Sequence, residues 1–452
     1  MRPVASPGVT TRGPEFVLRC LFWWTVLLAG LSILAYLLVF VNGRLLHLSY
    51  PYNTILFLPS LRFGDFTTFY RQCAHFGTPQ FWAHDRGALN YPAPAVYVLL
   101  PFFRMFPHHP RMAAGAYDLT VAGLALLAAL RLAWSARRST LSGPLAAVLA
   151  LTLVTSYPLM FMADRANVEG AAWLAAILGT WAFVRGSHSI AAVCFAGAAA
   201  IKLAPLVLIF LLLRRRDWKN AALFVATFLA LNVAAMWFLA PNFVSTLRHI
   251  VHGISSFQGR FFVVFPRGIG VDHSFFGLIK QPLWWIDYLS GAAPAWQLAA
   301  SRVCQLAYRL AWVVAAGFLI LRFRRLPMLN CLFAVFIVQM AALPESYDYT
   351  LLYLYIPWAV FIVLYLGQEV YARRATLPLT KVLAILVPCA IAFTPQQCYL
   401  VLPHGISFAG QIKALALLYL LIVTARVPLP CQAFAEPPEP GAAPVSAPGS
   451  AA

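Results

Sequence analysis

Apolar residues come along this chain in long blocks, separated by shorter segments that hold most of the charged residues. Most blocks approach the length of about 20 residues that an α-helix needs to cross the hydrocarbon core of a bilayer. They occupy residues 17–41, 91–106, 112–134, 141–162, 168–184, 190–213, 221–240, 275–289, 296–321, 328–343, 350–366, 377–393 and 406–423. This pattern predicts an all-α polytopic membrane protein with roughly 10–13 transmembrane helices.

Two longer polar stretches, 42–90 and 241–273, interrupt the apolar blocks. The first block follows a basic segment and is longer than the apolar core of a secretory signal. We therefore interpret it as a retained anchor with residues 1–16 in the cytoplasm. The polar stretches then become the first and second outer loops of a membrane domain over residues 17–425, and the Pro/Ala-rich tail 426–452 is expected to be disordered.

Two assignments of the membrane crossings would place the basic loops in the cytoplasm. If 91–106 and 112–134 both crossed, Arg137 and Arg138 would lie outside, against the preference of cytoplasmic loops for basic residues. Either the short block 91–106 is re-entrant, or 190–213, which is broken at Lys202-Leu-Ala-Pro205, makes two half-crossings. Irregular backbone at membrane depth is tolerated only where it lines a cavity within the protein. The segment around Lys202 is therefore a candidate cavity wall.

Composition and charge agree with lipid as the solvent. Of the 452 residues 62% are hydrophobic and 10% are charged, with a mean hydropathy of +0.76. The formal net charge of +19 comes from basic residues at the ends of apolar blocks, where they suit anionic lipid head groups. We therefore expect membrane lipids, and no nucleic acid, as partners. Cys73 and Cys398 both fall in stretches placed outside, so a disulfide between them stays open.

The first outer loop holds a candidate catalytic carboxylate. Phe66, Phe69, Tyr70 and Cys73 recur at helical spacing, which predicts an amphipathic segment lying on the membrane surface. Asp65 stands at its N-terminus. An aspartate in this position is either a plain helix cap or a catalytic group.

Two further groups carry charge at or near membrane depth. Asp164, Arg165, Asn167 and Glu169 stand between two apolar blocks, where they either pair with one another or line a cavity. Lys202 has apolar residues on both sides, and it either extends to the interface or faces an anion.

The later part of the chain adds two more groups. Arg260, Arg267 and His273 lie among aromatic residues of the second outer loop, which suits either the phosphate of a lipid or an aromatic interfacial belt. Glu345 and Asp348 lie between two apolar blocks, as either a clamp for sugar hydroxyls or a solvated turn.

Taken in order, these motifs resemble glycosyltransferase family 87, the polyprenyl-phosphate-mannose-dependent mannosyltransferases of the type-C membrane fold. The resemblance runs from the first block to Phe361. It rests on Asp65 with Tyr70 and Gly77, Asn90-Tyr91-Pro92, Asp164-Arg165-x-Asn167-x-Glu169, Ile201-Lys202-Leu-x-Pro205, Asp272-His273-Ser274 with Gly277, and Ser346-Tyr347-Asp348. The chain departs from the family at Tyr347 and Tyr349, where members commonly have Trp and His, and at His273, where Gln is usual.

The resemblance implies a type-C bundle in the cell (inner) membrane, with an extracytoplasmic loop between the first two helices and the active site on the extracytoplasmic side. It implies inverting transfer of a hexose, mannose in the family, from a polyprenyl-phosphate sugar donor to a glycolipid or glycan acceptor, without a cofactor or metal. Asp65 would be the general base. Lys202, Arg165, Arg260, Arg267 and His273 would bind the donor phosphate. Substrate contacts would come from Tyr70, Arg71, Asn90, Tyr91, Asn167, Glu169, Glu345 and Asp348.

Two other classes of protein stay open on sequence grounds. A transporter or lipid flippase would explain the many helices and the break at Lys202, although the internal repeat that is common in transporters is not evident. A non-catalytic envelope-assembly protein would explain the departure at Tyr349.

Overall fold

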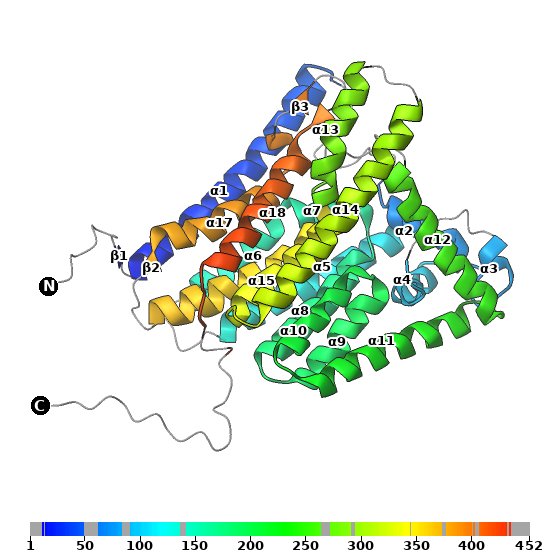
Figure 1. Cartoon of the computed structure of the whole chain (residues 1–452), viewed down its shortest axis with the longest axis horizontal. Helices are drawn as coiled ribbons and strands as arrows, with labels where there is room; N and C mark the ends of the chain where they lie inside the picture. Colours follow the sequence, from blue (N-terminus) through cyan, green and yellow to red (C-terminus); the bar gives the residue numbers. More distant parts are fainter. Residues whose placement is uncertain are drawn as a thin grey trace, which may run out of the picture.

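The computed structural model of the chain describes residues 11–12, 14–48, 62–83, 91–135, 142–263, 272–290, 294–343, 345–372, 377–399, 401–402, 406–431 and 434. Over these residues the protein is a bundle of α-helices (Figure 1). Its strands are two antiparallel pairs of two residues each, β1 (Thr11–Arg12) with β2 (Leu377–Pro378) and β3 (Val401–Leu402) with β4 (Ile406–Ser407). The predicted all-α class is confirmed.

The helices follow the apolar blocks closely. In the first half of the chain they are α1 (Pro14–Phe40), η1 (Val41–Leu45), α2 (Gly64–Cys73), α3 (Gln80–Ala83), α4 (Pro94–Met105), α5 (Pro110–Ser135), α6 (Ser142–Thr155), α7 (Tyr157–Arg165), α8 (Glu169–Val184), α9 (His188–Ile201), η3 (Ala204–Leu208) and α10 (Ile209–Arg214). In the second half they are α11 (Trp218–Leu239), α12 (Phe243–Val263), α13 (Phe275–Ser290), α14 (Pro294–Phe323), α15 (Met328–Ala341), η5 (Asp348–Leu351), α16 (Leu352–Val360), η6 (Phe361–Ala372), α17 (Leu379–Phe393), η7 (Gln396–Cys398) and α18 (Ala409–Arg426).

Six helical segments of the described chain are long and apolar enough to cross a membrane. They are Leu18–Leu45, Pro110–Trp134, Trp218–Leu239, Arg302–Phe323, Asp348–Val370 and Ala409–Arg426. The pair α6 and α7, bent by 48°, would make a seventh span, and the other predicted blocks form mostly shorter apolar helices. The chain is therefore a multi-pass membrane protein.

Both blocks that left the topology open contain helices shorter than a full crossing. α4 has 12 residues, or roughly 18 Å at about 1.5 Å per residue, which is less than the ~30 Å of a hydrocarbon core. It is one of the shorter apolar helices, and it is not among the helices long enough to cross a membrane alone. The predicted break at Lys202 is also present, because α9 ends at Ile201 and the chain continues as the 3-10 helix η3.

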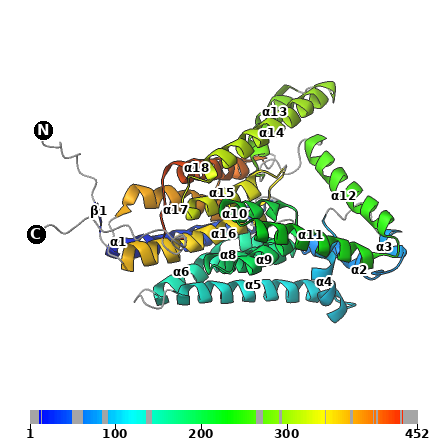
Figure 2. The same ribbon diagram turned by 60° about the horizontal axis from the view of Figure 1, so that its bottom comes forward.

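The centre of the bundle is α15, whose residues are buried along its whole length. A helix that is apolar on all sides is expected in such a position. α16 and α18 pack against α15, and α17 lies beside α18 and α1 (Figure 1). On the other side, α8, α9 and α11 pack in succession, and Figure 2 shows α5 running along the outer edge of this group.

Helix α2 in the first outer loop forms as predicted, but its surroundings differ from the prediction. Phe66, Phe69 and Cys73 are buried within the protein rather than laid on the membrane. The ring of Phe66 lies 4.7 Å from that of Phe103 and 5.9 Å from that of Tyr117, so α2 is anchored to α4 and α5. The amphipathic pattern was correct, and the apolar partner is the bundle.

The second outer loop, the two cysteines and the C-terminal tail can also be compared with the structure. Most of the second outer loop is the helix α12, whose partner is the first loop: the indole of Trp82 stacks on His249 at 4.7 Å. Cys73 and Cys398 are not joined in a disulfide. The tail beyond α18 lies outside the described residues, except for 427–431 and 434.

Close packing of α8 on α9 predicts a sharp difference between two glycines. A Cβ at Gly179 would lie 2.6 Å from Cε1 of the buried Phe195, whereas a Cβ at Gly197 meets nothing within 4 Å. We expect Gly179→Ala to destabilise the protein by about 1–3 kcal/mol through overpacking. Gly197→Ala is the matched control and leaves stability unchanged or higher. Thermal melting in detergent measures both, and equal melting temperatures would contradict the α8–α9 packing.

Candidate active site

The start of α2 is tied to the end of α7 by a backbone contact. Phe63 adopts a left-handed conformation with φ of 57°, and its N–H donates to the carbonyl of Asp164 at 2.7 Å. Gly64 follows, and a Cβ there would lie 3.1 Å from a guanidinium nitrogen of Arg165. A glycine therefore leaves room for the Arg165 side chain directly beside Asp65.

The turn between α7 and α8 presents Asn167 in a fixed orientation. Ala166 ends α7 in a left-handed conformation with φ of 46°. The Oδ1 of Asn167 accepts the backbone N–H of Glu169 at 2.8 Å, which caps the start of α8. Tyr117 supports the same turn, since its hydroxyl donates to the carbonyl of Asn167 at 2.8 Å. With its oxygen engaged, Asn167 must direct its amide nitrogen into the site.

The carboxylate of Asp65 contacts both Arg165 and Asn167. Arg165 forms an ion pair with its Oδ1, and the Nδ2 of Asn167 donates to its Oδ2 at 2.6 Å. Phe63 is the N-cap of α2 and makes no side-chain cap bond, and Asp65 is the second residue of the helix. The carboxylate therefore faces α7 and α8, which argues against the plain cap interpretation.

A second ion pair lies beside the first. Lys202 ends α9 in an extended conformation, and its ammonium pairs with Glu169. The same ammonium lies 5.5 Å from the ring centre of Tyr91 and 5.2 Å from that of Tyr349, a cation–π arrangement. Asn167 links the two pairs. Its Nδ2 donates to Asp65 and, at 3.2 Å, to the hydroxyl of Tyr91, whose ring contacts the ammonium of Lys202. Five segments distant in sequence thus meet at one polar centre, around residues 65, 91, 165–169, 202 and 349.

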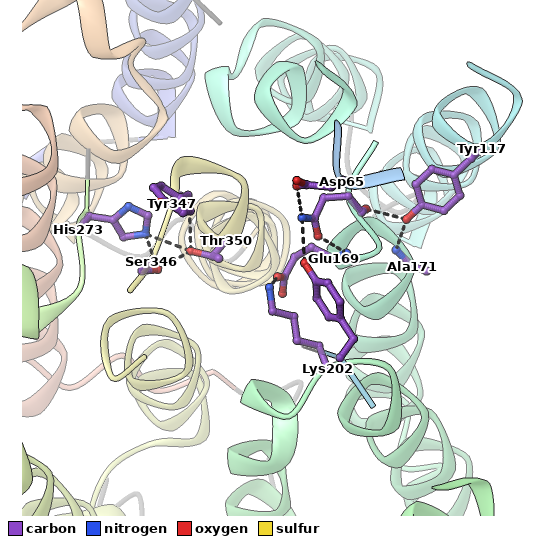
Figure 3. Close-up of polar contacts among 11 residues, drawn as sticks. Asp65, Tyr117, Glu169, Ala171, Lys202, His273, Ser346, Tyr347 and Thr350 are labelled. Atoms are coloured by element: carbon purple, nitrogen blue, oxygen red, sulfur yellow. Dashed lines mark hydrogen bonds and ion pairs between the residues drawn. The ribbon is translucent and has the colours of Figure 1, made fainter. Parts of the chain in front are cut away.

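A separate cluster holds His273, as Figure 3 shows. Its Nε2 lies 2.9 Å from the Ser346 hydroxyl and 3.0 Å from the Thr350 hydroxyl, while its Nδ1 is 3.8 Å from Asp348. Burial and the nearby Lys413 lower the pKa of this imidazole well below its usual value, so the ring is neutral. The charge partner of Asp348 is Lys413, at 2.7 Å.

Exposure separates the two clusters. The side chains of Asp65, Arg165 and Lys202 are 23%, 15% and 17% exposed. Those of Lys413 and Asp348 are 0% and 2% exposed. A third pair, Lys280 with Asp272 at 2.6 Å, is also buried. Of these groups, only the one formed by Asp65, Arg165 and Lys202 can contact a substrate without rearrangement. The buried Lys413–Asp348 and Lys280–Asp272 pairs fit a structural role.

Several predicted site residues are placed away from Asp65 or cannot be placed. Tyr70 points to the α4–α5 connection, where its hydroxyl donates to the carbonyl of Phe106 at 3.0 Å. No hydrogen bond or ion pair joins Glu345 to Asp65 in the described part of the chain, although Glu345 lies near enough to Asp272, Lys280 and Lys202 for their charges to affect its pKa; burial, followed by Asp272, raises that pKa to about 8. Asn90, Arg267 and the side chains of Arg71 and Arg260 lie outside the described residues.

Two residues of these clusters were missed in the sequence. Lys413 lies in an apolar block, and an ionisable residue at membrane depth is by itself a sign of a specific partner. Tyr349 was noted only as a departure from the resembled family. Its ring lies over the ammonium of Lys202, so the departure faces the polar centre.

The charged groups of the site are two carboxylates, Asp65 and Glu169, and two cations, Arg165 and Lys202. Within the described part of the chain, no group of three or more His, Cys, Asp or Glu side chains is placed to hold a metal ion.

The sequence model of glycosyltransferase family 87 matches residues 89–333, which is more than half of the chain. None of the curated proteins compared with this chain matches its sequence. The matched region includes Arg165, Asn167, Glu169 and Lys202 but not Asp65.

The buried pair of Lys413 and Asp348 gives a stability prediction. Lys413→Met leaves the Asp348 carboxylate without a counter-charge, which costs about 3–5 kcal/mol. The double variant Lys413→Met/Asp348→Asn removes both charges and should recover much of that loss. Thermal or denaturant unfolding in detergent measures both variants. A double variant that is less stable than the single one would contradict the pairing.

Proposed function

Because the chain belongs to glycosyltransferase family 87, and is therefore a membrane glycosyltransferase, we propose that it transfers a hexose, mannose, from a polyprenyl-phosphate donor to a lipid or glycan acceptor at the outer face of the cell (inner) membrane. The observation that carries this proposal is the partly exposed carboxylate of Asp65 next to Arg165, with Lys202 in the same polar centre. One carboxylate and two cations are what a single displacement from a sugar phosphate requires.

The proposed base is Asp65. The acceptor hydroxyl attacks the anomeric carbon, and its proton passes to the Asp65 carboxylate as the new glycosidic bond forms. The bond between the anomeric carbon and the phosphate oxygen breaks with its electron pair on that oxygen, which inverts the configuration and releases polyprenyl phosphate. Asn167 holds Oδ2 of Asp65 at 2.6 Å and so keeps the carboxylate in one orientation.

The proposed phosphate ligands are Arg165 and Lys202. The leaving phosphate gains negative charge in the transition state, and fixed cations stabilise that charge. The guanidinium of Arg165 can offer two parallel donors to a phosphate, while the ammonium of Lys202 acts as a point charge. Tyr91 and Tyr349 flank that ammonium and limit where it can move.

Substrate binding would exchange partners within the site. Without a donor, Arg165 neutralises Asp65 and Lys202 neutralises Glu169. The guanidinium of Arg165 occupies Oδ1 of Asp65, the oxygen that would otherwise be open to an acceptor hydroxyl. A donor phosphate that draws Arg165 toward itself would release Asp65 to accept a proton. The base would then become effective only when the donor is bound.

The placement of basic residues supports an outward-facing site. Glu169 starts α8 and Lys202 follows the end of α9, so the site lies at one end of this helix pair. At the other end, Arg215 contacts His188 at 3.3 Å, and Arg214 donates to the carbonyl of Phe323 at 2.9 Å. Basic residues gather at the cytoplasmic ends of transmembrane helices. Nucleotide sugars are absent outside the cytoplasm, which favours a lipid-linked donor.

Replacing the proposed base tests the reaction directly. We expect Asp65→Asn to lower the rate of sugar transfer by about 10²–10⁴-fold, the usual contribution of a general base. Purified protein is incubated with polyprenyl-phosphate mannose and a lipid extract of the cell envelope, and glycosylated lipid is measured by mass spectrometry.

The matched control is Asp217→Asn. Asp217 caps α11 at the opposite end of the bundle, and asparagine is an equally good cap, so the transfer rate should not change. Equal rates in the two variants would rule out Asp65 as the base. Transport of a lipid or scaffolding of an assembly, the other functions consistent with the sequence, should survive Asp65→Asn.

Arg165 gives an independent prediction. Arg165→Gln should lower kcat by about 10²–10³-fold, as loss of one transition-state donor does. Arg165→Lys keeps the charge but loses the planar fork, and its kcat should fall between those of the wild type and Arg165→Gln. Steady-state kinetics with varied donor concentration separates kcat from KM. A change confined to KM would show that Arg165 binds the donor without stabilising the leaving group.

A further inference from the structure

A large apolar groove lies between α5, α8 and the helix formed by α16 and η6, far from Asp65. Its volume is about 800 Å³, within the range of about 300–1,000 Å³ of pockets that bind small ligands. Its walls include Leu127, Leu178 and Ile356. Leu127 and Leu178 are exposed at the surface of the bundle, so the groove opens toward lipid.

Two arginines mark one end of this groove. Arg131 lies near the end of α5 and Arg185 caps the end of α8, and both line the cavity. The guanidinium of Arg185 lies 5.2 Å from the ring centre of Trp181, which also lines the groove. Arginine and tryptophan together are typical of the level of the lipid head groups. The apolar walls therefore continue from a cationic rim into the hydrocarbon depth.

The groove is at the opposite end of the bundle from the proposed active site. Arg185 follows Glu169 by sixteen positions along α8, which separates them by roughly 24 Å at about 1.5 Å per residue. A donor phosphate held near Arg165 and Lys202 cannot also reach this rim. A phosphate bound at this rim would therefore belong to a different molecule, one with an apolar body and an anionic head.

We propose that this groove is a binding site for an anionic glycerophospholipid, with its acyl chains along α5, α8 and α16 and its phosphate between Arg131 and Arg185. Basic pockets between transmembrane helices on the cytoplasmic side suit such head groups. The site is independent of the transfer reaction.

Native mass spectrometry of the purified full chain tests this site. Phosphatidylglycerol should bind the wild type more tightly than phosphatidylcholine does. Arg131→Gln/Arg185→Gln should weaken phosphatidylglycerol binding about 25-fold, if each arginine contributes about fivefold. The matched control is Arg324→Gln/Arg325→Gln, which removes the same charge from an exposed turn and should leave the affinity unchanged.

A third variant tests the groove without changing its charge. Its result does not depend on whether the arginine variant folds. Ala128→Phe narrows the groove without changing any charge, and it should weaken the binding of both phospholipids. Melting in phosphatidylcholine and detergent is recorded for each variant, and Ala128→Phe decides the question if the arginine variant does not fold. Equal binding of the two phospholipids by the wild type, unchanged affinity in both groove variants, or displacement of phosphatidylglycerol by equimolar polyprenyl phosphate would overturn the proposal.

Discussion

Carboxylates paired with cations hold distant segments of the chain together inside a bundle of apolar helices. Asp65 pairs with Arg165, Glu169 with Lys202, Asp348 with Lys413 and Asp272 with Lys280. Each charge alone would be costly at this depth, and each pair therefore fixes the two segments that supply it. Residues separated by about one hundred positions, such as Asp65 and Arg165, are held together in this way.

The pairs divide the molecule into a frame and a reactive centre. Lys413 and Asp348 are closed off from solvent and hold α18 to the start of the α16 segment. Asp65, Arg165 and Lys202 remain partly exposed in a site whose aromatic walls are Tyr91 and Tyr349. In the proposed reaction these same pairs are resting partners, which a donor phosphate would rearrange. The frame would stay rigid while the centre exchanges charges.

The sequence predicted the helical blocks, the break at Lys202 and the helix that carries Asp65, because apolar spacing and proline are local signals. Tertiary partners were harder to predict. The apolar face of α2 was assigned to the membrane surface, since the pattern alone cannot tell lipid from a protein neighbour. Lys413 was missed because its partner Asp348 lies 65 positions away, and His273 was predicted as a phosphate ligand although it is neutral and buried among hydroxyl groups.

In the proposed reaction the donor phosphate binds between Arg165 and Lys202 with its sugar facing Asp65. An electron cryo-microscopy structure of the full chain with a non-hydrolysable polyprenyl-phosphate sugar analogue would locate this phosphate. We expect phosphate oxygens within about 3 Å of the Arg165 guanidinium and the Lys202 ammonium, with the anomeric carbon open to Asp65. A phosphate bound at any other place, with the Asp65–Arg165 pair intact, would contradict this proposal.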